Sequence, residues 1–141
     1  MNVLIIDDSD LARAQLRRIL SAAGMKVFEQ PSAIGATRAI LQHGVDIALV
    51  DVSMPGLSGD KLVKVLRDNP RLDGLIIVVV SAKPEAELHA LVDIAGANAV
   101  LSKSRVEDEL VQVLTWHCKK LRHARSGVPS RATSEEDKCA K

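Results

Sequence analysis

Five polar residues of this 141-residue chain have side chains that could handle a phosphoryl group. They are Asp7, Asp8, Asp51, Ser81 and Lys103. Three carboxylates that lie close together repel one another, and a hard divalent cation with oxygen ligands, above all Mg²⁺, relieves that repulsion. A lysine ammonium and a hydroxyl beside such a cation can bind the oxygens of a transferring phosphoryl group, and a carboxylate can accept that group as an acyl phosphate. These residue types therefore predict metal-assisted phosphoryl transfer, provided that the fold brings them together.

Short apolar runs precede these residues and have the composition of buried strands. The apolar runs of the chain cover residues 3–6, 26–28, 47–50, 75–80 and 99–101. The first, third and fourth runs are continuous and rich in Val, Ile and Leu, which is typical of parallel strands that are covered on both faces. The second and fifth runs are shorter and weaker, so they suit the edges of a sheet.

Apolar residues at helical spacing fill the intervals between these runs. The predicted helices cover residues 10–23, 32–43, 58–68, 84–95 and 104–121, and Ser104 with Glu107 matches a capping box at the start of the last one. Strands that alternate with helices predict an α/β fold: a doubly wound, five-stranded parallel sheet with helices on both faces. If the strand order is the flavodoxin-like 2-1-3-4-5, the five polar residues converge at the carboxyl ends of the strands, where such sheets bind ligands.

The motifs around these residues resemble those of the response-regulator receiver domains of two-component signalling. The matching elements are the acidic pair Asp7-Asp8, the segment DVSMPGLSGDKL that begins at Asp51, Ser81-Ala82, and Lys103. The resemblance extends from residue 2 to about residue 121. It implies a signalling switch that takes a phosphoryl group from a sensor histidine kinase or a histidine phosphotransfer protein. Such a switch catalyses only its own phosphorylation and dephosphorylation.

The resemblance also implies how the acceptor and the metal ion are bound. Asp51 would be the phosphoacceptor. Mg²⁺ would be bound directly by Asp8, by Asp51 and by the backbone carbonyl of Ser53, and through a water molecule by Asp7.

For the phosphoryl group, the resemblance implies three contacts. Lys103 would bind the phosphoryl oxygens, the Ser81 hydroxyl would move toward them, and the backbone amide of Ala82 would donate a further hydrogen bond. Lys83 and the side chain of Ser53 would lie beside the path of the attacking water. We therefore expect these two side chains to modulate the lifetime of the phosphorylated state.

Two positions depart from the family pattern. Ser104 follows Lys103 where the family usually has a proline joined by a cis bond, and a cis bond before another residue costs about 3–4 kcal/mol. The loop either tolerates that cost or is trans, in which case Lys103 approaches the site differently. Val100 stands where the family often has an aromatic switch residue. Because a β-branched side chain has few rotamers, we expect only a small conformational response around Val100.

Three other functions compete with this interpretation. The first of them stays open, and the sequence argues against the other two. A receiver-like docking module that is never phosphorylated would fit the departures at Ser104 and Val100. An aspartate-nucleophile phosphohydrolase commonly has a second acid two residues after its nucleophile, and Ser53 stands at that position, which argues against this class. A nucleotide-binding domain is disfavoured because the loop after residues 3–6 contains no glycine.

The composition is that of a globular protein without a membrane segment. Hydrophobic residues make up 47% of the chain and charged residues 26%, and no apolar run reaches the roughly 18 residues of a membrane span. The chain starts without the basic region of a signal peptide, so we expect a cytoplasmic protein. Charge is unevenly distributed, with a net charge of −3 over residues 1–118 and of +4 over residues 119–141.

We expect a receiver domain over residues 1–121 and a flexible basic tail or linker over residues 122–141. Its partners are then the phosphodonor protein and either a downstream protein or an effector domain of a longer chain. We expect any homodimer to form through the last two helices, with Trp116 as a candidate apolar contact. The scarcity of aromatic residues, which are Phe28 and Trp116, argues against nucleic-acid binding.

Overall fold

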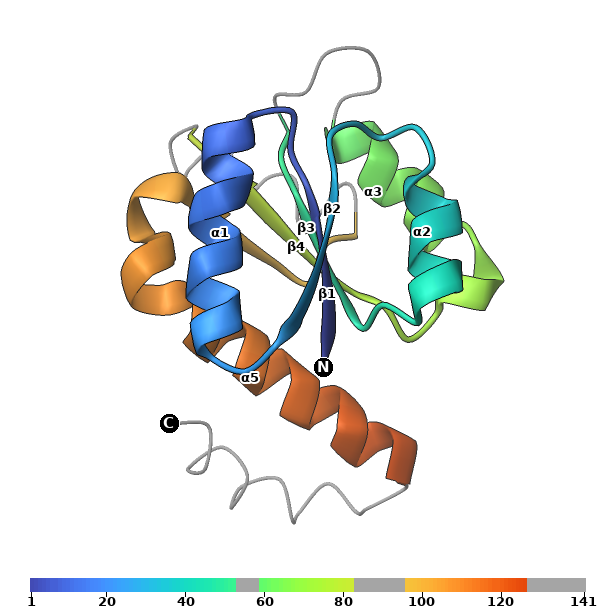
Figure 1. Ribbon diagram of the computed structural model, residues 1–141. Coiled ribbons are helices and arrows are strands. Elements are labelled where there is room, and N and C mark those ends of the chain that lie inside the picture. The colour runs from blue at the N-terminus through green and yellow to red at the C-terminus, as the bar shows by residue number, and fades with distance from the viewer. Residues whose placement is uncertain (53–58, 83–95, 127–141) are drawn as a thin grey trace.

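Five parallel strands form one sheet, so their carboxyl ends all lie at the same end of the sheet (Figure 1). The computed structural model describes residues 1–52, 59–82 and 96–126. Within these residues the strand order is β2-β1-β3-β4-β5. The strands are β1 (Asn2–Ile6), β2 (Lys26–Gln30), β3 (Ile47–Val50), β4 (Ile76–Ser81) and β5 (Ala99–Ser102). All neighbouring strands pair in parallel, which confirms the predicted doubly wound α/β fold.

Helices cover both faces of the sheet. The described helices are α1 (Asp10–Ala22), α2 (Ala36–His43), α3 (Gly59–Arg67) and α5 (Val106–Ser126), with the short 3₁₀ helices η1 (Pro70–Leu72) and η2 (Lys103–Arg105). Figure 1 shows α1 and α5 on one face of the sheet and α2 and α3 on the other. None of the described helices has the length and apolar character that crossing a membrane requires. The helix predicted over residues 84–95 lies outside the described residues.

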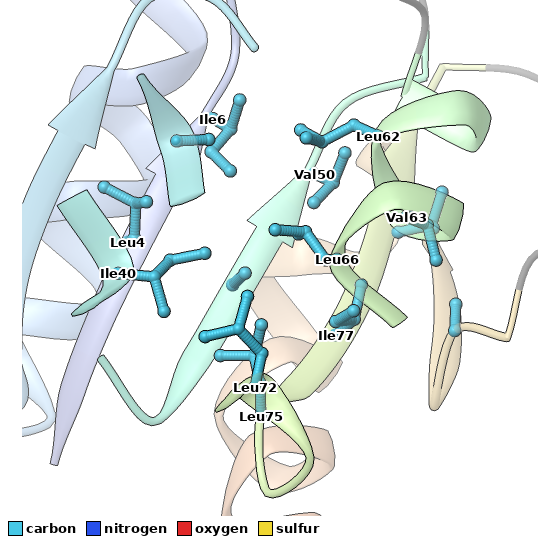
Figure 2. Close-up of a cluster of buried hydrophobic side chains, with 14 of the residues drawn as sticks. Leu4, Ile6, Ile40, Val50, Leu62, Val63, Leu66, Leu72, Leu75 and Ile77 are labelled. Carbon is cyan, nitrogen blue, oxygen red and sulfur yellow. The ribbon is translucent and has the colours of Figure 1, made fainter. Parts of the chain in front are cut away.

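Residues along the central strands alternate between two hydrophobic cores. Leu4 and Ile6 of β1 belong to the core beneath α2 and α3 (Figure 2). Val3 and Ile5 of the same strand belong to the core beneath α1 and α5. Successive side chains of a strand point to opposite faces, and here both faces are covered. The central strands are therefore continuously apolar, as is typical of buried parallel strands.

Polar residues bracket the apolar strand β3 at both ends. At its amino end, Asp46 Oδ2 accepts a hydrogen bond from the Asn2 N–H (2.9 Å), and the Asp46 N–H donates to the Asn2 carbonyl (2.8 Å). At its carboxyl end, the Asp51 N–H donates to the Ile6 carbonyl at 3.0 Å. Ile6 lies opposite Val50 in the register, so the residues that follow β1 and β3 leave the sheet side by side.

Two helix ends differ from the predictions. α2 begins at Ala36 and not at residue 32, because Gly35 in front of it has a left-handed φ of 84° that an α-helix does not contain. α5 continues to Ser126, whereas the sequence predicts that the helix ends at Leu121 and that a flexible tail follows. The additional turn contains arginine and alanine, which favour helix formation.

The start of α5 also differs from the predicted capping box. Ser104 lies within η2, which precedes α5, and its N–H donates to the Oγ of Ser102, the N-cap of η2, at 3.4 Å. The Glu107 carboxylate accepts hydrogen bonds from Gln15 and Arg18 of α1. The predicted capping box is therefore wrong, because the Glu107 carboxylate binds side chains of α1.

Candidate functional site

Three carboxylates gather where β1 and β3 end. Asp7 and Asp8 follow β1, Asp51 follows β3, and one oxygen from each of the three lies within 4.8 Å of the others. Asp7 and Asp51 are only 2% and 4% exposed, whereas Asp8 is exposed to solvent. Negative charges buried this close together are unfavourable unless a cation compensates them. The fold thus brings together the three carboxylates that the sequence singles out.

The donors of this cluster fit a hard divalent cation. All three are carboxylate oxygens, and Mg²⁺ takes oxygen ligands at about 2.1 Å in an octahedral shell that keeps several waters. Zinc and copper sites draw mainly on histidine and cysteine, and this cluster contains only aspartates. The exposed Asp8 leaves the cluster accessible to an ion and to the water that completes its shell.

The Lys103 ammonium group faces both buried carboxylates. Its Nζ lies 3.0 Å from Asp7 Oδ2 and 4.0 Å from Asp51 Oδ1. Lys103 begins η2 directly after β5, so the edge strand of the sheet delivers it to the site. Every peptide bond among the described residues is trans, including the bond between Lys103 and Ser104. Of the two alternatives for this loop, the trans form is therefore the one observed, and the lysine still reaches the carboxylates.

Ser81 is the last residue of β4 and is fully buried. In the register it lies opposite Ser102 of β5, directly before Lys103. Ala82 follows Ser81 and is exposed. The hydroxyl of Ser81 and the backbone of Ala82 thus lie at the same edge of the sheet as the acidic cluster and the lysine.

Three further residues were singled out from the sequence. Ser53 and Lys83 lie outside the described residues, so their roles stay predictions. Val100 of β5 is half-buried, lies opposite Val79 of β4, and packs against the core beneath α2 and α3. A valine in this position is part of the packing between strand and helices.

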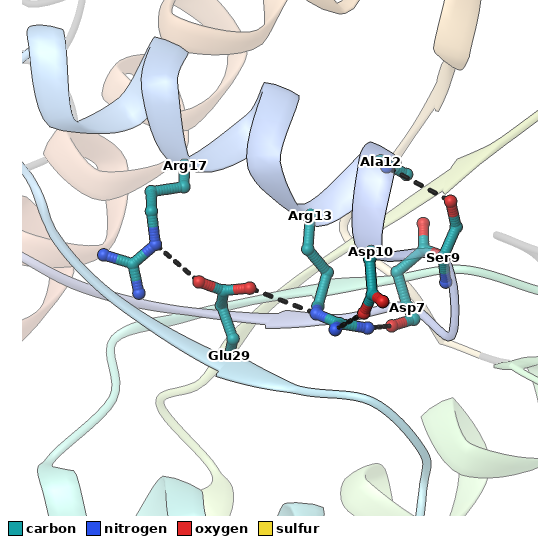
Figure 3. Close-up of polar contacts among 7 residues, drawn as sticks. All are labelled: Asp7, Ser9, Asp10, Ala12, Arg13, Arg17 and Glu29. Carbon is teal, nitrogen blue, oxygen red and sulfur yellow. Dashed lines mark hydrogen bonds and ion pairs between the residues drawn. The ribbon is translucent and has the colours of Figure 1, made fainter.

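Hydrogen bonds fix both the backbone and the side chain of Asp7, and Figure 3 shows the one between Arg13 and the Asp7 carbonyl. The Asp7 N–H donates to the Gln30 carbonyl of β2 (3.2 Å), and the Asp7 carbonyl accepts from Arg13 Nη1 (2.6 Å). Asp7 Oδ1 accepts the Ser9 N–H at 2.9 Å. Ser9 also caps α1, because its Oγ accepts the Ala12 N–H at 3.2 Å. One short turn therefore sets both the start of α1 and the direction of the Asp7 carboxylate.

Arg13 and Glu29 contribute to this region, and the sequence analysis misses both. Arg13 Nε lies 3.1 Å from Glu29 Oε1, Arg13 also pairs with Asp10, and Arg17 pairs with the other oxygen of Glu29 (Figure 3). Hydrogen bonds from Arg17 and then Arg13 lower the pKa of Glu29 below its ordinary value of 4.5, against the opposing effect of burial. The i, i+3 spacing of Asp10 and Arg13 is visible in the sequence. The contact with Glu29 joins a helix to a strand 16 residues further on, so no local pattern reveals it.

Trp116 of α5 is half-buried beside β5. With Ala99 and Val113 it lines an open cavity of about 340 Å³. Lys120 Nζ lies 4.9 Å from the centre of the indole ring, which is a cation–π contact. Burial, together with the charge of Lys120, lowers the pKa of the neighbouring His117. The role of Trp116 in binding a partner stays a prediction.

Curated relatives share the sequence pattern over most of this chain. The chain is 34% identical over 118 residues to a cyclic di-GMP phosphodiesterase of Thermotoga maritima, a match that covers 83% of this chain and 30% of the relative. It is 35% identical over 117 residues to the response regulator UvrY of Escherichia coli K12, which covers 81% of this chain and 52% of UvrY. The chain thus spans about half, or less, of the length of these relatives.

Solved structures share the fold. The chemotaxis protein CheY4 of Vibrio cholerae superimposes with a TM-score of 0.73 and 25% identity, covering 80% of this chain and 94% of CheY4. A response regulator from Chloroflexus aurantiacus superimposes with a TM-score of 0.77 and 30% identity, covering 82% of this chain and 95% of that structure. The family described as response regulator receiver domain matches residues 3–115. With the strand order, the acidic cluster and this match in agreement, the chain belongs to the family of response-regulator receiver domains.

Proposed function

We propose that this receiver domain accepts a phosphoryl group on Asp51 from a phosphohistidine of a sensor kinase or a phosphotransfer protein. The observation that carries the proposal is a buried Asp51 carboxylate grouped with two further carboxylates and an ammonium group. Asp51 is 4% exposed, and its Oδ1 lies 4.0 Å from Lys103 Nζ. A carboxylate held in this way has a cation beside it to stabilise negative charge that develops on the phosphoryl oxygens.

In the proposed step, an Asp51 carboxylate oxygen forms a bond to phosphorus while the bond from phosphorus to the donor imidazole nitrogen breaks. The electron pair of the broken bond stays on the imidazole nitrogen, and Asp51 becomes an acyl phosphate. The Lys103 ammonium group stabilises the charge on the phosphoryl oxygens during the transfer. Hydrolysis ends the phosphorylated state when water attacks phosphorus and the Asp51 carboxylate leaves.

Mg²⁺ is the proposed cofactor of this step, because the three aspartates offer only oxygen donors within 4.8 Å of one another. Asp8 and Asp51 would hold the ion directly, together with the Ser53 carbonyl. Asp7 would contact it through water, since Asp7 Oδ2 is already paired with Lys103 at 3.0 Å. A bound ion would neutralise the charge between the carboxylates and the phosphoryl oxygens.

Phosphorylation on this scheme makes the domain a signalling switch, and not an enzyme that turns over a separate substrate. The receiver domain would span residues 1–121 and be followed by a basic tail or linker over residues 122–141, of which residues 127–141 lie outside the described residues. Its partners would be the phosphodonor protein and a downstream protein or effector domain, and its location would be the cytoplasm. If the domain forms a homodimer, the last two helices would supply the contact, with Trp116 as a candidate residue.

Phosphoryl uptake from a small donor tests the proposed acceptor. The protein is incubated with acetyl phosphate and Mg²⁺, and intact mass spectrometry counts the phosphoryl groups that it gains. We expect one group on the wild type and none on Asp51→Asn, while the variant still unfolds cooperatively. Uptake by Asp51→Asn at the wild-type rate would place the acceptor elsewhere.

The same incubation, with released inorganic phosphate measured as well, separates the rival functions. No uptake by the wild type, either from acetyl phosphate or from a phosphorylated histidine phosphotransfer protein, would favour the docking module. Release of many equivalents of inorganic phosphate without a phosphorylated form would favour the phosphohydrolase.

A further inference from the structure

The Arg13 guanidinium joins three structural elements at the edge of the acidic cluster (Figure 3). Its Nη1 donates to the Asp7 carbonyl (2.6 Å) and its Nε to Glu29 Oε1 of β2 (3.1 Å), while its Nη2 pairs with Asp10 in the first turn of α1. The Arg13 side chain is only 12% exposed, whereas that of Asp10 is 93% exposed. The two contacts of consequence are therefore those with the Asp7 backbone and with Glu29.

The contact with the Asp7 carbonyl acts on the acidic pair. This carbonyl belongs to the peptide group between Asp7 and Asp8, so its orientation sets the directions in which both carboxylates leave the backbone. On the other side of the same residue, the Asp7 N–H donates to Gln30 at 3.2 Å. Arg13 thus completes the fixation of the segment that carries two of the three carboxylates.

Glu29 in turn holds Arg13 in place. Its two carboxylate oxygens bind two arginines that lie one turn apart on α1, Oε1 contacting Arg13 and Oε2 contacting Arg17. A planar guanidinium can use Nε and Nη1 on different acceptors at once, which a lysine ammonium on its flexible stem cannot reproduce. The position of Arg13 therefore depends on its shape as well as on its charge.

We propose that Arg13, held by Glu29, is a positioning residue for the metal-binding carboxylates Asp7 and Asp8. The proposal rests on the proposed function, because it assumes that the acidic cluster binds Mg²⁺. Arg13 acts through the Asp7–Asp8 peptide group and does not itself contact the ion.

Charge and positioning predict opposite effects on Mg²⁺ affinity. Arg13 is a cation near a site for a divalent cation, so its charge alone opposes Mg²⁺ binding, and removing that charge should strengthen binding. Loss of positioning should weaken binding instead, because the carboxylates then have to be ordered when the ion binds. The sign of the change therefore separates the two roles.

The test is calorimetric titration of Mg²⁺ into the unphosphorylated protein and its variants. For Arg13→Gln we expect roughly 10-fold weaker binding, the scale at which residues behind metal ligands act. Arg13→Lys keeps the charge and loses the planar group, and we expect it to bind Mg²⁺ several-fold more weakly than the wild type. Arg17→Gln is the matched control, because Arg17 pairs with the same Glu29, and we expect Mg²⁺ affinity within about twofold of the wild type. Urea unfolding without metal shows how far each variant is destabilised.

Several results would overturn the inference. They are unchanged or tighter Mg²⁺ binding by Arg13→Gln, wild-type affinity in Arg13→Lys, or equal weakening in Arg17→Gln. If Arg13→Gln does not fold, Arg13→Lys and Glu29→Gln decide in its place, and wild-type affinity in both would likewise contradict the proposal. A wild-type protein that binds no Mg²⁺ would instead remove the metal part of the proposed function, and the inference with it. A wild type that binds Mg²⁺ but takes up no phosphoryl group would leave the inference standing and overturn only the proposed transfer.

Discussion

The two halves of the site are held in different ways. In the acidic half, which consists of Asp7, Asp8 and Asp51, hydrogen bonds hold the backbone of Asp7 against β2 and α1 and that of Asp51 against β1. In the lysine half, which consists of residues 102–104, the Lys103 ammonium lies at the end of a long side chain and is placed by the carboxylates that it faces. The backbone of two carboxylates that we propose for the metal site is thus fixed by hydrogen bonds within the protein. The position of the ammonium group that we propose for the phosphoryl oxygens depends instead on the conformation of the lysine side chain.

Asp8→Asn should have the largest effect, because it removes a proposed Mg²⁺ ligand from the acidic half. We expect Mg²⁺ affinity, measured by calorimetric titration, to fall by more than about 10-fold. Without metal the same variant should be at least as stable as the wild type, because one of three mutually repelling charges is gone. Asp68→Asn, at an exposed position after α3, is the control and should leave both quantities unchanged. Unchanged Mg²⁺ affinity in Asp8→Asn would remove Asp8 from the metal site.

Lys103→Met should move Mg²⁺ affinity in the opposite direction. The ammonium 3.0 Å from Asp7 Oδ2 competes with an ion for the same charge, so its removal should strengthen Mg²⁺ binding several-fold. Phosphoryl uptake should nevertheless become slower, because the charge on the phosphoryl oxygens loses a stabilising cation. In urea unfolding without metal, we expect a loss of about 1 kcal/mol, because a buried carboxylate loses a partner that is itself partly exposed.

Lys64→Met, at an exposed position on α3, is the matched control for the loss of one lysine charge. Weaker Mg²⁺ binding by Lys103→Met than by this control would mean that the lysine supports metal binding, as the acidic half does. The contrast between the acidic half and the lysine half would then fail.

The smallest predicted effect concerns the support behind the acidic half. The pKa of Glu29 in the folded protein lies below its ordinary value of 4.5, so its carboxylate stabilises the fold above that pH. This contribution is lost as the pH falls through the lower pKa of the folded state. The difference in unfolding free energy between the wild type and Glu29→Gln should therefore shrink below pH 4.5. A difference that stays constant, in urea titrations from about pH 6 down to about pH 3, would contradict the role given to Glu29.

Sequence patterns were sufficient to predict the strands of the sheet, because each strand has its own apolar run in the local sequence. Strand β3 coincides with the apolar run at residues 47–50, and the turn at Gly44 ends the helix before it. The acidic cluster follows from that topology, because parallel strands present their carboxyl ends at one edge. Whether Lys103 can reach that edge from a trans loop does not follow from the topology. It depends on the length of the side chain and the path of η2.

The sequence did not predict the contacts between side chains of different helices and strands. Glu107 has the spacing of a capping residue, but α1 lies close enough to take its carboxylate. Arg13 and Glu29 read as ordinary charged residues of a helix and a strand. Their importance comes from packing α1 beside β2, which places a largely buried guanidinium against the Asp7 carbonyl. A pairing of this kind has no periodic signal in the sequence.

The apolar stretch of β3 does not by itself specify how the strand aligns with β1. Both faces of β3 are buried, so a slip by one residue would still place apolar side chains in both cores. Such a slip would move Asp46 or Asp51 opposite the apolar residues of β1 and break the hydrogen bonds between Asp46 and Asn2. The polar side chain of Asp51, the proposed acceptor, thus also disfavours a shifted register between β3 and β1. Asparagine in place of Asp51 keeps a polar side chain at this position. Leucine would lengthen the apolar stretch, so that a sheet with a shifted register could also form.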